Sequence, residues 1–378
     1  PQQGVGYSYT AYSQFPWPDL HRLDTRPYGL QTKPPRKDGK ESDEKIVSLC
    51  LCAFVVKMPF SLPSVCSEKR SSGIISGEAE YSALGRRTRA RIHEETALVV
   101  DSGIYVANLT AFKDGKLDVD AMRDHAEFLI KSGVAGLCPA GTTGEFLYLS
   151  AQEKKLIFLT LIAQCRGRSK ILCCPWDANV DAMADLCRSV SDKGADGIFL
   201  PPPIYYEFTD TEIVDFYEFI RRNSGVPVYC YNIPKYSNNE IRIDALQAMV
   251  DRKLVGGIKD SSANEERLRT IISRFGDTLD ILAGGDHFVL KAKTLGANGF
   301  ISALGNIYPE LFVALWNSPT EELQRKICTL RDGIKGYGGI PALKYLLSKR
   351  GYPCGCRFPF KELDDAQKRA LDTLADSL

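Results

Sequence analysis

From residue 103 to the C-terminus, short apolar runs alternate with longer stretches in which apolar residues recur at helical spacing. Such alternation is typical of βα units around a parallel sheet. The apolar runs predict strands at 104–110, 136–139, 170–175, 197–200, 226–231, 255–259, 279–283 and 299–302. The stretches between them predict helices at 118–132, 151–166, 180–193, 209–223, 242–252, 264–275 and 287–295, and another that begins near residue 309. Eight such units predict an α/β protein, the (β/α)8 TIM barrel.

Helix start and stop signals agree with this periodicity. Ser150 precedes Glu153 by three residues, the spacing of a capping box at the start of a helix. Gly133, Gly194 and Gly296 each follow a predicted helix, where a left-handed residue is needed before the next strand. The helix ends are therefore predicted by two independent signals.

The two ends of the chain differ from the regular part. Residues 1–95 carry clusters of Pro, Gly, Ser, Tyr and charge without a sustained period, which predicts a poorly ordered N-terminal extension. The barrel is assigned to residues 96–318. Residues 319–378 contain amphipathic stretches at 321–335, 342–349 and 364–376, which predict a C-terminal helical appendix. The first methionine is Met58, so we expect the opening segment to be an incomplete or mis-assigned N-terminus.

The composition of residues 58–94 bears on the cellular location that the sequence predicts. This stretch is rich in Ser and Arg, as transit peptides are, but Glu68, Glu78 and Glu80 weigh against one. We therefore expect a cytoplasmic protein, with a mitochondrial location as the alternative if this stretch is a transit peptide. The apolar run at 46–56 is about half as long as a membrane helix, so no membrane partner is expected.

Composition narrows the class of protein without defining its chemistry. The 44% hydrophobic and 25% charged shares are those of an ordinary globular protein, and a net charge of +1 gives no reason to expect a nucleic-acid partner. Several of the 12 cysteines fall in predicted buried strands, so reduced thiols are expected. The close pairs Cys50/Cys52 and Cys354/Cys356 lack a second pair at zinc spacing, and there are only 4 histidines. No metal site is therefore expected.

In a (β/α)8 barrel, the groups that act on a substrate lie at the carboxyl ends of the strands and in the loops that follow. The sixth predicted strand ends on Lys259. A charged ammonium at the end of an apolar strand is costly to desolvate, and the neutral amine thus favoured is the form that attacks a ketone to give a Schiff base. A lysine that reaches solvent or pairs with Asp260 is the alternative, and for an isolated lysine it is the more common one.

Three other strand ends carry candidate groups. The fifth strand ends on Tyr231, whose phenol could exchange protons with a neighbouring amine or whose ring could simply pack in the barrel. The second leads into Gly-Thr-Thr-Gly-Glu at 141–145, where a tight turn would offer backbone N–H groups and two hydroxyls to a carboxylate, although such turns are common without a ligand. After the fourth strand, Tyr205 and Tyr206 follow three prolines on a stiff loop that could equally be an interface plug.

Together these segments resemble a known family. Gly-Thr-Thr-Gly-Glu at 141–145, Tyr-Asn-Ile-Pro at 231–234 and Gly-Ile-Lys-Asp at 257–260 are similar, in order and spacing, to the three signatures of the dihydrodipicolinate synthase / N-acetylneuraminate lyase family. The similarity runs from about residue 103 to the C-terminus and leaves 1–95 outside it. It implies class I aldolase chemistry, in which pyruvate, or a 2-keto acid that yields it, is bound covalently as a lysine imine, with no metal or organic cofactor.

The resemblance also implies catalytic roles for matching residues. Lys259 would form the Schiff base, Tyr231 would shuttle protons, and Thr142 would relay protons toward Tyr206. In some relatives this last tyrosine enters the site of a neighbouring subunit. A homo-oligomer, a dimer or a homotetramer, is therefore expected.

Further positions are implied to bind the substrate. Gly141 would shape the loop after the second strand, and Thr143 would hold the substrate carboxylate beside the preceding threonine. Asp286, after the seventh strand, would touch the distal part of the substrate. Ile301, on the eighth strand, would face the amine and the phenol through its backbone carbonyl.

The sequence departs from the family pattern at Tyr236. Dihydrodipicolinate synthases carry an arginine at this position to hold a second carboxylate, and Lys235 could replace its charge but not its bidentate fork. A tyrosine hydroxyl suits a hydroxylated chain, and Gly-Tyr-Pro at 351–353 with Phe-Pro at 358–359 is also similar to sugar-acid aldolases of the family. The favoured substrate is therefore a 2-keto-3-deoxy sugar acid or a similar 2-keto acid, cleaved to pyruvate and an aldehyde.

Other functions stay open at this point. The same imine could serve a condensation of pyruvate with aspartate semialdehyde, or a dehydratase reaction. A catalytically silent binding barrel is the non-enzymatic alternative, because fold does not fix function. The presence of both Lys259 and Tyr231 weighs against that last alternative.

Overall fold

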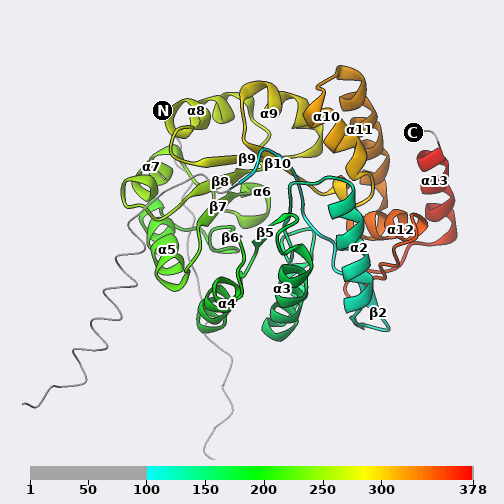
Figure 1. The fold of residues 1–378 in the computed structure, drawn as a ribbon, viewed down its shortest axis with the longest axis horizontal. Coiled ribbons are helices and arrows are strands. Elements are labelled where there is room, and N and C mark those ends of the chain that lie inside the picture. Colours follow the sequence, from blue (N-terminus) through cyan, green and yellow to red (C-terminus); the bar gives the residue numbers. More distant parts are fainter. Residues whose placement is uncertain (1–99, 377–378) are drawn as a thin grey trace, which may run out of the picture. The chain divides into compact units, whose positions relative to one another are not determined.

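The computed structural model describes residues 100–376, and its parallel strands close into a barrel (Figure 1). Each barrel strand is hydrogen-bonded to its neighbours in the order β1-β10-β9-β8-β7-β6-β5-β4. The strands span β1 Gly103–Val106, β4 Gly136–Leu137, β5 Lys170–Cys173, β6 Gly197–Leu200, β7 Val228–Asn232, β8 Gly257–Asp260, β9 Asp280–Gly284 and β10 Gly299–Ser302. The predicted (β/α)8 fold is confirmed. The predicted N-terminal extension, including the stretches 46–56 and 58–94, lies outside the described residues.

Helices surround the barrel, as Figure 1 shows. They are α2 Val119–Lys131, α3 Ala151–Cys165, α4 Val180–Asp192, α5 Asp210–Asn223, α7 Ile243–Asp251, α8 Glu265–Phe275, α9 Val289–Leu295 and α10 Pro309–Asn317. The predicted C-terminal helices are α11 Glu321–Ile334, α12 Ile340–Lys349 and α13 Asp365–Asp376, which gather on one side of the barrel. No helix between residues 100 and 376 is long and apolar enough to cross a membrane.

The predicted helix signals are confirmed in detail. Glu153 N donates to Ser150 Oγ over 3.2 Å and Ser150 N donates to Glu153 Oε2 over 2.9 Å, which completes the capping box of α3. Gly133, Gly194 and Gly296 have φ of 81°, 85° and 98°, the left-handed region.

Some strand boundaries were predicted too long. The first strand was expected to reach residue 110 but ends at Val106. Ala107 N and Asn108 N still donate to Ser302 O and Cys138 O at the ends of the neighbouring strands, and the chain leaves the sheet after them. Leu109 N donates to Asn306 Oδ1 over 3.0 Å, so buried apolar residues here belong to a loop. The hairpin of β2 Phe112–Lys113 and β3 Lys116–Leu117, the single turn α6 Pro234–Ser237 and the 3-10 turns were not predicted, since they are too short to show a period.

The floor of the barrel is built from large side chains opposite glycines. A Cβ on Gly136 would lie 2.2 Å from the Tyr105 ring, and a Cβ on Gly257 would lie 2.3 Å from the Tyr229 ring. Gly299 on β10 adjoins the other edge of the Tyr105 ring. Both tyrosines are fully buried. In each case one strand supplies the ring, and a glycine on the neighbouring strand leaves the space for it.

We expect Gly257→Ala to destabilise this floor strongly. The added methyl would also lie 2.7 Å from Asp280 O, and backbone atoms cannot move aside cheaply. The free energy of unfolding should fall by about 3 kcal/mol or more, measured by denaturant titration. Gly336→Ala is the control, because no atom lies within 4 Å of its added Cβ. Equal stability of the two variants would contradict the packing argument.

His125, on α2, contacts the segment after β10 and the C-terminal part of the chain. Its Nε2 lies 3.0 Å from Asn306 O, and its ring lies near those of Phe128 and Tyr352. Burial lowers the pKa of His125 to about 4. The imidazole is therefore neutral in the folded protein over a pH range in which it is charged in the unfolded chain.

This shift predicts a specific loss of stability in acid. Between pH 6.5 and 4 the unfolded chain binds a proton that the folded chain does not, so stability falls as pH falls. The His125 contribution should amount to about 3 kcal/mol over this window. His125→Gln keeps a donor for Asn306 O and should lack this part of the pH dependence, measured by urea unfolding at each pH. An unchanged slope in the variant would refute the assignment.

Candidate active site

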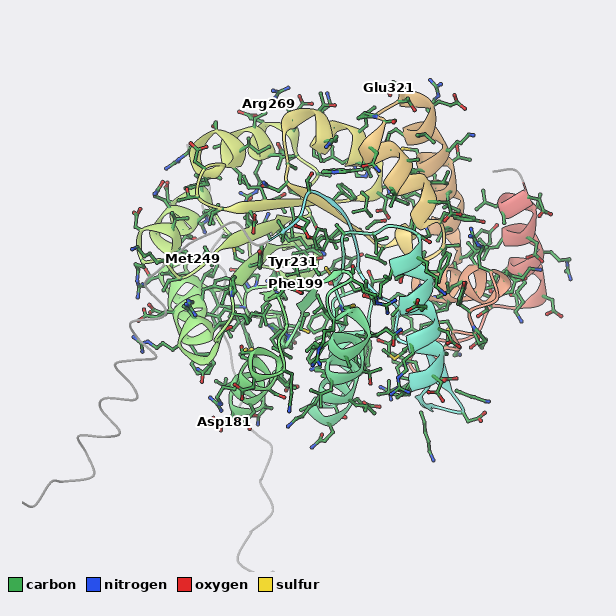
Figure 2. All side chains as sticks on the ribbon, in the orientation of Figure 1. Asp181, Phe199, Tyr231, Met249, Arg269 and Glu321 are labelled. Atoms are coloured by element: carbon green, nitrogen blue, oxygen red, sulfur yellow. The ribbon has the colours of Figure 1, made fainter. Side chains whose placement is uncertain are left out.

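Alternation along β8 turns Lys259 into the barrel. Gly257 faces the interior, so the residue two positions further on faces it too. The Lys259 side chain is 5% exposed, and its Nζ lies 4.0 Å from the centre of the Tyr231 ring and 5.2 Å from that of Phe199. Tyr231 stands opposite Lys259 in the register of β7 and β8. Figure 2 shows Phe199 and Tyr231 in the middle of the ring of helices.

The acid next to this lysine in sequence is engaged elsewhere. Arg267 Nε donates to Asp260 Oδ2 over 2.7 Å, and Asn232 Nδ2 donates to the same oxygen over 2.8 Å. Lys259 itself makes no ion pair or hydrogen bond with any residue of 100–376, and the rings of Phe199 and Tyr231 lie against its amine. Lys259 therefore neither reaches solvent nor pairs with Asp260.

The thiols near the amine remain neutral. Burial raises the pKa of Cys138 to about 12 and that of Cys174 to about 11, although the nearby Lys259 charge acts in the opposite direction. Cys138 follows β4 and Cys174 follows β5, so both lie at the carboxyl ends of their strands. Neither thiol is therefore a thiolate that could pair with the amine. All nine cysteines in the described part of the chain are unpaired.

The turn after β4 leaves several polar groups open. The backbone N–H groups and the hydroxyls of Thr142 and Thr143 form no hydrogen bond within residues 100–376, and both side chains are half-buried. Thr110 Oγ1 donates to Gly144 O over 2.7 Å, and a Cβ on Gly144 would lie 2.9 Å from Asn108 O. Contacts at Gly144 thus fix the turn, while the N–H groups and hydroxyls of Thr142 and Thr143 stay available for an anion.

Phe199 connects this turn with the amine. A Cβ on Gly141 would lie 3.1 Å from Phe199 Cζ, and the same ring lies 5.2 Å from Lys259 Nζ. The structure therefore brings the threonine turn, the phenol of Tyr231 and the amine around one aromatic side chain. This arrangement can hold a small carboxylate with its neighbouring carbon close to the amine.

Two predicted tyrosines lie on the exposed rim instead. Tyr206 is 69% exposed and Tyr236 is 62% exposed, with Lys235 Nζ 5.4 Å from the Tyr236 ring centre. Asn239 Nδ2 donates to Tyr206 O over 2.8 Å and so holds the Tyr205–Tyr206 loop against the segment that follows α6. Neither tyrosine lies beside the amine within one copy of the chain.

The remaining predicted positions lie in and beside the last two barrel strands. Ile301 is 3% exposed and stands opposite Tyr105 and Gly284 in the sheet. Asp286 is buried after β9, where Leu304 N donates to its Oδ2 over 3.2 Å. Its other carboxylate oxygen has no hydrogen-bond partner within the described chain, and burial raises the pKa of Asp286.

Sequence reasoning overlooked two features of the site. Phe199 could have been found, because it stands two residues after Gly197 on the same inward face of β6. The second is a fully buried Lys344 on α12, which contacts Glu145 directly after the threonine turn. A lysine within the apolar sequence Ile-Pro-Ala-Leu-Lys-Tyr-Leu-Leu was a visible anomaly, but its partner was not.

Fold and site define a class, a (β/α)8 barrel with an unpaired lysine buried at a strand end. The chain also matches the family model described as the dihydrodipicolinate synthetase family over residues 101–378. It is 31% identical over 287 residues to an uncharacterized DapA-like lyase of Halobacterium salinarum, covering 72% of this chain and 93% of the relative. A 4-hydroxy-tetrahydrodipicolinate synthase of Magnetococcus marinus is 30% identical over 215 residues, covering 57% of this chain and 74% of the relative.

The solved structures agree. CdNal from Clostridium difficile, crystallised in complex with mannosamine, superposes with a TM-score of 0.70 at 27% identity, over 73% of this chain and 98% of that one. The chain therefore belongs to the dihydrodipicolinate synthetase family, and the resemblance seen in its motifs is confirmed.

Proposed function

We propose that this chain is a pyruvate-dependent class I aldolase, a carbon–carbon lyase that forms a Schiff base on Lys259. One observation carries the proposal: the amine is buried at a strand end, without an ionic or hydrogen-bonding partner in residues 100–376, 4.0 Å from the Tyr231 ring. An amine that no acid or hydrogen-bond acceptor engages is free to attack a keto carbon.

The protonated imine formed on the lysine serves as the electron sink. Lys259 Nζ adds to the keto carbon, and the carbinolamine loses water to give this imine. The hydroxyl on the fourth carbon then gives its proton to a base, the bond between the third and fourth carbons breaks, its electron pair moves toward the imine nitrogen, and the aldehyde leaves. The enamine takes up a proton and is hydrolysed to pyruvate and free Lys259. Tyr231 is assigned the proton transfers, and the turn with Thr142 and Thr143 the substrate carboxylate.

The rim residues are assigned to the rest of the substrate. Tyr236 offers a phenol, beside the Lys235 ammonium, where the resemblance places an arginine in dihydrodipicolinate synthases, and this favours a hydroxylated 2-keto-3-deoxy acid. Asp286 is assigned to hydroxyl groups further along this chain, and Ile301 to the wall beside the amine. Tyr206 is too exposed to act within its own subunit, so we assign it to a neighbouring site in a homodimer or homotetramer.

A second candidate is the condensation of pyruvate with aspartate semialdehyde. Its support is the relative named 4-hydroxy-tetrahydrodipicolinate synthase, together with the Lys235 charge on the rim. Both candidates share the imine and differ in the aldehyde.

Borohydride trapping tests the shared step, and a substrate panel separates the candidates. Pyruvate with borohydride should add a stable mass to the peptide that contains Lys259. Pyruvate release should then be measured over several 2-keto-3-deoxy acids, with aspartate semialdehyde condensation run alongside. A chain that gains no mass would refute the proposal, and condensation without release would favour the second candidate.

A further inference from the structure

The turn that is assigned to the substrate carboxylate is bracketed by strained backbone. Ala140 and Glu145 have φ of 52° and 63°, in the left-handed region that costs a residue with a Cβ energy. Such conformations persist only where the surroundings hold them. Within the turn, Glu145 N donates to Thr142 O over 3.2 Å and Phe146 N donates to Gly141 O over 3.3 Å, neither of them a short bond.

A buried ion pair holds the far side of this turn. Lys344 Nζ lies 2.5 Å from Glu145 Oε1, and both side chains are almost completely buried, with 1% and 2% exposure. Oε1 accepts no hydrogen bond from another group between residues 100 and 376. Lys344 therefore provides the contact on which this oxygen depends.

Lys344 is itself fixed by the C-terminal part of the chain. Its Nζ donates to Gly355 O over 3.1 Å and lies 4.6 Å from the centre of the Phe112 ring. The stem belongs to α12, whose neighbours Leu343 and Leu346 are buried. The ion pair thus connects the strained turn after β4 with a rigid helix far away in the sequence.

Burial and the charge of Lys344 act in opposite directions on the Glu145 carboxylate. Burial raises the pKa of Glu145, and the Lys344 ammonium acts against that rise. The other ionisable groups near the pair are Arg357, Cys354, Cys356 and Glu362. Arg357 is engaged with Glu153 and with Tyr148 O, so it cannot replace Lys344 without giving up those contacts.

We propose that the Glu145–Lys344 ion pair is a positioning device, which anchors the Thr142–Thr143 turn to α12 in the conformation that receives the substrate carboxylate. The inference rests on the proposed function, because it assigns a role within that same site. Neither residue is assigned to the reacting atoms. With the pair broken, Glu145 can leave the left-handed region, and the turn no longer holds its unbonded N–H groups in place.

The test separates binding of the carboxylate from chemistry at the amine. Borohydride trapping of pyruvate is followed by mass at increasing pyruvate concentration, which gives a half-saturating concentration and a rate at saturation. Lys344→Met should raise the half-saturating concentration roughly tenfold and Glu145→Gln roughly threefold, while the rate at saturation changes less than about twofold. The double variant should bind no worse than Lys344→Met alone, because the two changes remove one interaction.

Asp280→Asn is the matched control. It also exchanges a buried carboxylate for an amide, but at the floor of the barrel, where Tyr229 donates to Asp280 Oδ2 over 2.7 Å. It should lower the melting temperature and leave the half-saturating concentration unchanged. If Lys344→Met fails to fold, the nearly isosteric Glu145→Gln decides the question.

The outcomes distinguish this inference from the proposed function. Wild-type chain that traps pyruvate, with both variants destabilised but within twofold of its half-saturating concentration, would overturn the positioning role alone. An equal loss in the rate at saturation would also overturn it. Wild-type chain that traps no pyruvate would overturn the proposed function and this inference together.

Discussion

Lys259→Met is expected to lose turnover by at least about four orders of magnitude while keeping its fold. Methionine fills nearly the same volume but cannot add to a keto carbon, so no electron sink forms. Because it also replaces a buried amine that has no ionic partner between residues 100 and 376, the melting temperature should stay equal or rise. Steady-state turnover, borohydride trapping and calorimetry measure these effects.

The control for this variant is Lys291→Met. Lys291 lies on α9, is 48% exposed and pairs with Glu265 over 3.2 Å. Loss of a surface pair has little effect, so turnover should remain. Trapped pyruvate on the Lys259→Met chain would remove this lysine from the mechanism.

Tyr231→Phe should lower turnover by roughly 10²–10⁴-fold, the usual contribution of a positioned proton carrier. The ring that flanks Lys259 is kept, so the expected loss comes from the phenolic oxygen alone. Tyr229→Phe makes the same chemical change one layer below, where the phenol donates to Asp280 Oδ2 over 2.7 Å. That variant should lose stability, because the buried Asp280 carboxylate loses one of its hydrogen-bond donors, and retain turnover.

Comparison of the two phenols gives the decisive result. Tyr231→Phe should lose turnover and keep its melting temperature. Tyr229→Phe should keep its turnover and have a lower melting temperature. Near-normal turnover in Tyr231→Phe would exclude the proton-transfer role. Equal losses of turnover in both variants would indicate a general effect on the barrel interior.

The fold was predictable because most strands fall in apolar runs and most helices carry one apolar face. The apolar runs placed Lys259 and Tyr231 near the carboxyl ends of their strands, and the strands end one residue further on, at Asp260 and Asn232. Strand ends were less predictable, because buried Ala107 and Leu109 follow Val106, but Leu109 N donates to the Asn306 side chain, 197 residues away in the sequence. The sequence around Leu109 gives no indication of such a contact.

The site could be predicted only as far as single strands determine it. That Asp260 belongs to Arg267 and not to Lys259 depends on where α8 packs. The pairing of Glu145 with Lys344 depends on the path of the whole C-terminal part. The exposure of Tyr206 and Tyr236 follows from loop positions that periodicity does not describe.

The floor of buried tyrosines has a consequence for water. Tyr105 and Tyr229 lie in the barrel below the amine, and their hydroxyls bind Asp101 O and Asp280. Under the proposed mechanism, the water that the carbinolamine loses meets these two rings on its lower side. We therefore expect it to leave by the opening through which the keto acid enters, so that product departure and rehydration of the imine use the same route.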